Sequence, residues 1–158
     1  IRRADALDFT EADWDAVIDV DLKSVFFLSQ AVARRMVARA ARGKIINIAS
    51  LLSFQGGVRV AAYTAAKSGL AELPRLLACE WAPRGINVNA IAPGYFETNN
   101  TEALRADSAR NAAILARIPA GHWGKPEEIG GAAVFLASPA SDYVHGVTLP
   151  VDGGWLAR

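Results

Sequence analysis

The sequence predicts an α/β fold built on a doubly wound parallel sheet, of which this chain holds one half. Two observations support this. Segments with helical periodicity alternate with short apolar runs, in the order helix–strand–helix–strand–helix–strand. The run at 44–50 is rich in β-branched residues and shows little alternation of apolar and polar side chains, which is typical of a strand buried on both faces of a parallel sheet.

The first expected element is a long helix over residues 11–42. Thr10 and the acidic residues that follow it form a capping box, which marks a helix start. Apolar side chains then recur with helical spacing and surround much of the helix, as in a helix that is covered on two sides. Gly43 stands where a helix typically ends.

The remaining elements alternate between strands and helices. In chain order they are a strand at 44–50, a helix at 61–82, a strand at 86–92, short helical pieces within 102–118, a helix at 126–137 and a strand at 147–151. Proline and glycine mark several of their ends. The polar segment over 95–124 is of the kind that forms a lid or a substrate loop.

Length, charge and cysteine content narrow the class of protein. The chain has 158 residues, 17 of them basic and 16 acidic, and this near-neutral balance disfavours nucleic acid and anionic membranes as partners. The single cysteine cannot form an intramolecular disulfide, and no apolar stretch approaches the length of about 18 residues that a membrane span needs. No cluster of His and Cys has metal-ligand spacing. We therefore expect a cytoplasmic protein without a metal, and a single partial domain over residues 1–158.

One part of such a fold is not found in the sequence. A dinucleotide-binding sheet normally carries a glycine-rich turn, G-x-G-x-x-G, after its first strand, and this pattern does not occur here. The sequence is therefore expected to be the C-terminal portion of a longer protein. The alternative is a truncated, non-catalytic chain that acts only as an oligomerising module.

Tyr63 and Lys67 stand one turn apart on the same face of the second helix, near its start. A phenol is almost fully protonated at neutral pH, and a neighbouring ammonium group lowers its pKa by stabilising the phenolate. Such a phenol can exchange a proton with a substrate hydroxyl. Ser50, at the carboxyl end of a buried strand, can hydrogen-bond the same substrate oxygen. Tyrosine and lysine at this spacing are by themselves more often a surface pair, so Ser50 and the strand end at Pro93-Gly94 are what favour a catalytic site.

Further motifs along the chain match one family. They are Asn47-Ile48-Ala49-Ser50, Tyr63-x-x-x-Lys67-Ser68-Gly69, Ile86-Asn87-Val88-Asn89-Ala90-Ile91-Ala92-Pro93-Gly94, Thr98, Phe135-Leu136-Ala137-Ser138, Asp142-Tyr143-Val144-His145-Gly146 and Val151-Asp152-Gly153-Gly154. Their order and spacing resemble the short-chain dehydrogenase/reductases over essentially the whole chain. The resemblance implies a Rossmann-type fold, NAD(P)-dependent interconversion of a secondary alcohol and a ketone, and a homo-oligomer (dimer or tetramer) built through the helices at 11–42 and 61–82.

The resemblance also assigns roles to single residues. Tyr63 is the expected general acid/base, Lys67 its partner, which also touches the nicotinamide ribose, and Ser50 the residue that binds the substrate oxygen. The expected cofactor-binding residues are Tyr63, Lys67, Ile91, Pro93, Gly94 and Thr98. The cofactor is expected to be NAD, with NADP left open because the half that chooses between them is not in this sequence.

Asp21 departs from the family pattern. It stands where the family usually has an asparagine that orders a water leading protons to the lysine. An ionised carboxylate there would oppose phenolate formation at Tyr63 unless Lys67 pairs with it. Asp21 is therefore a catalytic candidate, and its alternative role is that of a helix acid paired with a lysine or arginine.

Three segments indicate the substrate. Residues 51–57, 92–101 and 118–124 resemble the group of 2-deoxy-D-gluconate 3-dehydrogenases, also described as 2-dehydro-3-deoxy-D-gluconate 5-dehydrogenases. Gluconate 5-dehydrogenases and 3-oxoacyl carrier-protein reductases share much of this scaffold and are the alternatives. The expected small-molecule substrate is a sugar acid, whose carboxylate needs a cation. Candidate substrate residues are Ser50, Arg59, Tyr95, Arg105, Arg117 and His122.

Overall fold

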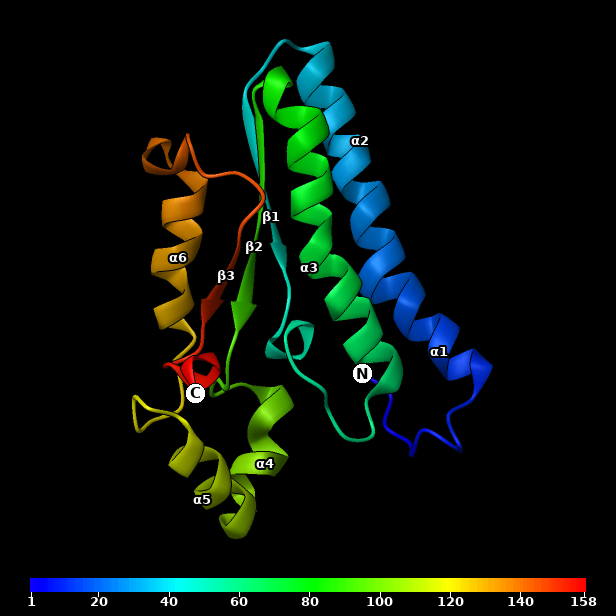
Figure 1. Ribbon diagram of the computed structural model, residues 1–158, viewed down its shortest axis with the longest axis vertical. Coiled ribbons are helices and arrows are strands. Elements are labelled where there is room, and N and C mark those ends of the chain that lie inside the picture. Colours follow the sequence, from blue (N-terminus) through cyan, green and yellow to red (C-terminus); the bar gives the residue numbers. More distant parts are fainter.

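A three-stranded parallel sheet forms the centre of the computed structural model, which describes residues 1–158 (Figure 1). The strands are β1 (Gly43–Ile48), β2 (Ile86–Pro93) and β3 (Thr148–Val151), in the order β1-β2-β3. The register places Ile45 opposite Val88 and Ala90 opposite Thr148. The predicted parallel α/β fold is confirmed, and the central strand β2 is buried from Ile86 to Ala92, including the polar Asn87 and Asn89.

Helices cover both faces of the sheet. On one face lie α1 (Glu11–Ile18), α2 (Ser24–Ala38) and α3 (Ala61–Trp81), and on the other lies α6 (Glu127–Ala137) (Figure 1). The short helices α4 (Glu102–Ala106) and α5 (Ser108–Arg117) lie beyond the carboxyl ends of the strands. None of these helices is both long and apolar enough to cross a membrane.

The first helical run differs from its prediction in two ways. It passes through a π-helical turn at Asp19–Lys23, and it ends at Ala38 instead of continuing to residue 42. Ala40 adopts a left-handed conformation (φ 50°), and Gly43 begins β1 instead of ending the helix. The end of the Met36 side chain packs against Gly43, so that an added Cβ there would displace it. The other predicted elements begin and end within about two residues of the observed ones.

Strand β1 lies at one edge of the sheet. Only one of its sides pairs with another strand, and Ile48 at its end is 51% exposed. A groove of about 440 Å³ runs along this edge between β1 and α2, and Lys67 lines its end nearest α3.

Candidate active site

A cavity of about 250 Å³ lies at the carboxyl ends of β1 and β2 and brings predicted site residues together. Ser50 follows β1, Tyr63 lies in the first turn of α3, and Pro93 and Gly94 end β2. All four line this cavity. Residues from three separate segments of the chain therefore meet where a parallel sheet typically binds its ligand.

Hydrogen bonds fix the backbone around Ser50. Its hydroxyl accepts a hydrogen bond from the Leu52 N–H at 3.2 Å, and its own N–H donates to the Ser53 hydroxyl at 3.3 Å. The Ser53 hydroxyl in turn donates to the Lys67 carbonyl at 2.6 Å. This reciprocal capping of a short 3₁₀ turn ties the end of β1 to helix α3, and so holds Ser50 close to Tyr63.

Lys67 lies beneath the Tyr63 ring, with its Nζ 5.6 Å from the ring centroid. The ammonium group donates a hydrogen bond to the Ile48 carbonyl at 2.9 Å and lies 3.6 Å from Asp21 Oδ1. The Lys67 and Asp21 side chains are only 11% and 24% exposed. The expected ion pair between Asp21 and Lys67 is thus present. Asp21 lies in the π-helical turn at Asp19–Lys23 and Lys67 lies on α3.

The titration of Tyr63 differs from its prediction. Burial raises the pKa of the phenol above its ordinary value, the nearby Ser50 hydroxyl opposes this rise, and the Asp21 carboxylate adds to it. Burial also lowers the pKa of Lys67, against the raising effect of Asp21. The net shift is the reverse of the expected lowering of the phenol pKa, because burial disfavours the phenolate and the Asp21 carboxylate adds to that effect.

The expected cofactor-binding residues do not all lie on one surface. Pro93 and Gly94 line the cavity, whereas Ile91 is fully buried within β2. Thr98 begins a short 3₁₀ turn outside the cavity and lines a separate shallow depression. Gly94 packs so closely against Asp152 that an added Cβ would lie 2.6 Å from the Asp152 Cα.

Two predicted substrate cations lie away from the cavity. Arg59 is 57% exposed in its side chain and pairs with Asp5 at 3.4 Å. Arg105 donates to the Thr98 carbonyl at 3.3 Å. Neither lines the cavity, because local partners hold each guanidinium elsewhere.

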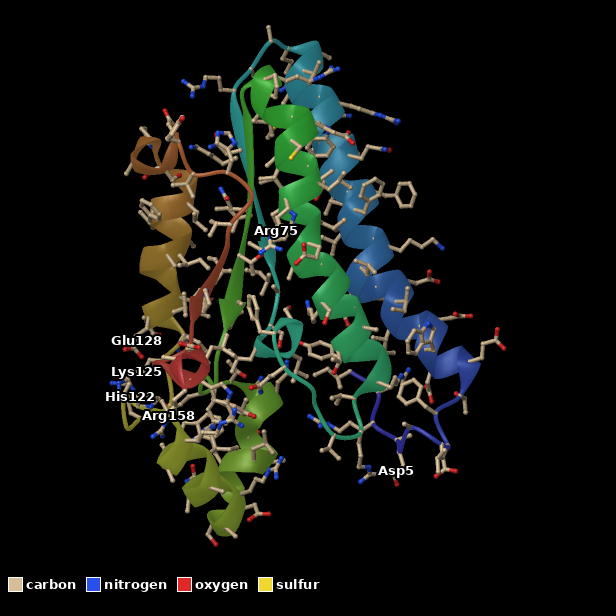
Figure 2. The ribbon with its side chains drawn as sticks, viewed as in Figure 1. Asp5, Arg75, His122, Lys125, Glu128 and Arg158 are labelled. Carbon is tan, nitrogen blue, oxygen red and sulfur yellow. The ribbon has the colours of Figure 1, made fainter.

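Of the remaining candidates, only Tyr95 lines the cavity. Arg117 stacks on the Trp155 ring, with its guanidinium carbon 4.0 Å from the ring centroid. His122 Nδ1 lies 2.9 Å from the Trp123 carbonyl, and the residue lines a different, smaller cavity. Figure 2 shows His122 on the opposite side of the strands from α3.

Five polar residues that line the cavity were not among the predicted site residues: Arg3, Gln55, Asn100, Thr101 and Arg110. Gln55 lies in the loop between the Ser50 turn and α3, and Arg110 lies on α5. Arg110 stands two turns before Arg117 and hence on the same side of α5, which is the signal that could have identified it. No Asp or Glu lines the cavity.

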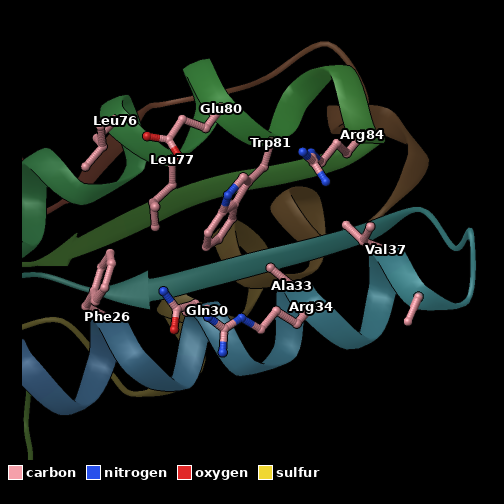
Figure 3. A pocket seen from close by; sticks show the side chains of 11 residues that line it. Phe26, Gln30, Ala33, Arg34, Val37, Leu76, Leu77, Glu80, Trp81 and Arg84 are labelled. Carbon is pink, nitrogen blue, oxygen red and sulfur yellow. The ribbon is translucent and has the colours of Figure 1, made fainter.

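Two further features of the structure concern metal ligands and a second cavity. No three His, Cys, Asp or Glu side chains are grouped so that they could hold a metal ion. A larger cavity of about 650 Å³ lies between α2 and α3, at the ends of these helices farthest from Tyr63. Figure 3 shows Trp81, Leu77, Phe26 and Ala33 around it, together with charged residues at its rim.

Comparison with known proteins assigns the family. The sequence profile described as enoyl-(acyl carrier protein) reductase matches residues 2–156. The chain belongs to the short-chain dehydrogenase/reductase family. Among relatives in this family, the 2-dehydro-3-deoxy-D-gluconate 5-dehydrogenase of Escherichia coli (strain K12) is 64% identical over 158 residues, which are 100% of this chain and 62% of that protein. The chain thus spans about 62% of the length of this relative.

Solved structures of the family agree with the fold. A structure from Agrobacterium tumefaciens with bound NADP is 69% identical, with a TM-score of 0.98, and the match covers 100% of this chain and 64% of that one. A gluconate 5-dehydrogenase from Burkholderia cenocepacia in complex with NADP and tartrate is 46% identical, with a TM-score of 0.95. That match covers 99% of this chain and 61% of the other.

Proposed function

We propose that the complete protein is an NAD(P)-dependent oxidoreductase that interconverts a secondary alcohol and a ketone on a sugar acid of the 2-deoxygluconate or 2-keto-3-deoxygluconate type. Residues 1–158 are, in this proposal, its catalytic half. The main support is the placement of Tyr63 and Ser50 on one cavity at the carboxyl ends of β1 and β2.

Tyr63 carries the proton chemistry of this proposal. Because burial raises the pKa of the phenol, the group is protonated at neutral pH and suited to give its proton to the oxygen of a ketone that is being reduced. In the oxidation direction the phenolate takes that proton from the substrate hydroxyl. Ser50 holds the same substrate oxygen by a hydrogen bond, and the Lys67 charge stabilises the phenolate from beneath the ring.

Tyr63, Pro93 and Gly94 on the cavity, with Lys67 on the neighbouring groove along β1, would hold the nicotinamide end of NAD or NADP. The Lys67 ammonium has three N–H donors, of which one is used by the Ile48 carbonyl and another faces Asp21. The third donor suits a ribose hydroxyl. When bound, the nicotinamide ring supplies the hydride chemistry. The NADP in the related structures supports NADP alongside the expected NAD.

The charge of the cavity supports an anionic substrate. Arg3 and Arg110 contribute positive charge to its lining, and no lining residue is acidic. The relatives point the same way, since the Escherichia coli protein is named for a sugar acid and the Burkholderia cenocepacia structure holds tartrate, a dicarboxylate.

We also propose that the complete protein is a homo-oligomer that associates through α1, α2 and α3. Val20, Phe27, Leu28 and Leu76 lie in this helical run and are each between 51% and 67% exposed. The cavity of Figure 3 opens on the same helices. A second copy of the protein would cover this apolar surface, and sedimentation velocity of the complete protein measures whether it does.

The test of the function is an absorbance assay of nicotinamide reduction in the complete protein. Substrates are 2-dehydro-3-deoxy-D-gluconate, 2-deoxy-D-gluconate, D-gluconate and uncharged sugar alcohols, each with NAD and with NADP. We expect turnover of a sugar acid, and a loss of kcat of about 10²- to 10⁴-fold in Tyr63→Phe. Absence of turnover with every sugar acid, or full activity of Tyr63→Phe, would overturn the proposal.

A further inference from the structure

Gln55 is held by two donors at the edge of the cavity. Its side-chain oxygen Oε1 accepts hydrogen bonds from Trp155 Nε1 at 3.0 Å and from Arg117 Nη2 at 3.3 Å. A carbonyl oxygen has two lone pairs, so both are in use. The amide NH₂ of Gln55 makes no hydrogen bond within the protein and remains available as a donor on the cavity that Gln55 lines.

The two donors to Gln55 are themselves fixed. Trp155 is buried, with 4% exposure, and the Arg117 guanidinium carbon lies over its ring, 4.0 Å from the centroid. Arg158 donates to the Arg117 and Ala116 carbonyls at 3.3 and 2.7 Å, which anchors the end of α5. Arg117 therefore acts on the cavity through Gln55 and not by reaching into it.

Arg110 lies on the same side of α5, two turns earlier, and its side chain has no ion-pair or hydrogen-bond partner. The helix beneath it is fixed, because Trp123 Nε1 donates to Asn111 Oδ1 at 2.7 Å and Ile114 is buried in the cluster around Trp123. A fixed backbone with an unengaged guanidinium on the cavity suits the capture of an anion.

We propose that Arg110 and Gln55 bind the carboxylate of the substrate, and that Arg117 is a positioning residue that orients Gln55. The proposal rests on the proposed function and names residues that determine its substrate class. Arg110 supplies charge, and the Gln55 amide supplies a directed hydrogen bond. The site therefore selects an acid over the corresponding uncharged polyol.

The first experiment compares two probes of similar shape, tartrate and the uncharged threitol, as inhibitors of the complete protein, alongside kcat/KM for the sugar acid. In Arg110→Gln we expect tartrate inhibition and sugar-acid kcat/KM to weaken by about ten- to a hundred-fold, the loss of one charge-assisted hydrogen bond, with threitol unchanged. Arg110→Lys keeps the charge and should retain most of the preference. Arg59→Gln, which removes an exposed arginine outside the cavity, is the matched control and should change neither inhibitor.

The second experiment tests the positioning role by a double-mutant cycle. We expect Gln55→Ala and Arg117→Ala each to raise KM for the sugar acid with little change in kcat, and Arg117→Ala to add almost nothing in the Gln55→Ala background. If Arg117→Ala raises KM by the same factor in the unmodified protein and in the Gln55→Ala variant, the positioning role of Arg117 is wrong.

The outcomes separate this inference from the proposed function. If the unmodified protein turns over no sugar acid, the proposed function fails. If it does turn over a sugar acid and Arg110→Gln weakens tartrate and threitol equally, or neither, then the carboxylate site is wrong while the function stands.

Discussion

Lys67 Nζ lies 3.6 Å from Asp21 Oδ1, and the same carboxylate opposes the lowering of the Lys67 pKa by burial and adds to the raising of the Tyr63 pKa. One acid within a π-helical turn thus acts on both titrating groups of the candidate site. Its effect on Lys67 keeps the ammonium charged against burial, and its effect on Tyr63 disfavours the phenolate.

Replacing Asp21 by Asn should move the pH dependence of substrate oxidation. Oxidation needs the phenolate, so its rate rises as the pH passes upward through the Tyr63 pKa. Because Asp21 raises that pKa, Asp21→Asn should shift the rising limb to lower pH, as measured by kcat/KM across pH. Asp19→Asn, in the same turn but paired outward with Lys23 at 2.9 Å, should leave the limb in place. If the rising limb of kcat/KM stays at the same pH in Asp21→Asn, Asp21 does not raise the pKa of Tyr63.

Ser50 and Ser53 allow the catalytic and structural roles of a hydroxyl to be separated. Both belong to the same reciprocal cap, so Ser50→Ala and Ser53→Ala should each lower the free energy of unfolding by about 1 kcal/mol in urea denaturation. Ser50 lines the cavity and Ser53 does not. Only Ser50→Ala should therefore lose about 10²-fold in kcat. Similar losses of kcat in both variants would show that activity depends on the structure of the cap and not on contact between the Ser50 hydroxyl and the substrate.

The hydrogen bond from Trp123 to Asn111 should stabilise the segment from α5 to Trp123. Trp123 is 6% exposed, so Asn111→Ala leaves a buried indole N–H without its acceptor. We expect a loss of about 1–3 kcal/mol in the free energy of unfolding, measured by urea denaturation. Asn99→Ala, an exposed asparagine without a side-chain hydrogen bond, is the control, and a loss of the same size there would refute the explanation.

Gly94 should not tolerate a methyl group. The added Cβ would meet the backbone of Asp152 at 2.6 Å, and a backbone contact cannot be relieved by a change of rotamer. Gly94→Ala should cost about 1–3 kcal/mol and distort the cavity edge, as seen in thermal denaturation and in kcat. Gly56→Ala, whose Cβ would meet nothing within 4 Å, should be close to neutral.

Most of the fold could be predicted because it depends on local patterns. The buried run of β2 and the breaks at Pro83 and Gly85 determine a strand and a helix end almost by themselves. The π-helical turn at Asp19–Lys23 could not be predicted, because the local sequence carries no proline, glycine or other signal that marks it.

The candidate site could be predicted where a motif fixed it and not where contacts between distant segments decided it. Ser50 and Tyr63 converge as their motif indicates. Which of Arg110 and Arg117 lines the cavity depends on Trp155 and Gln55. Both lie far from these arginines in the sequence, and both contact Arg117, which does not line the cavity.

The π-helical turn at Asp19–Lys23 amounts to one inserted residue in an otherwise regular helix. Deleting a single residue there would restore α-helical winding and rotate α1 by about 100° about its axis relative to α2. Val17 would then leave its contacts with Ala62 and Ala66, which lie on either side of Tyr63 on α3. This stretch of the gene should therefore not tolerate the in-frame loss of one codon.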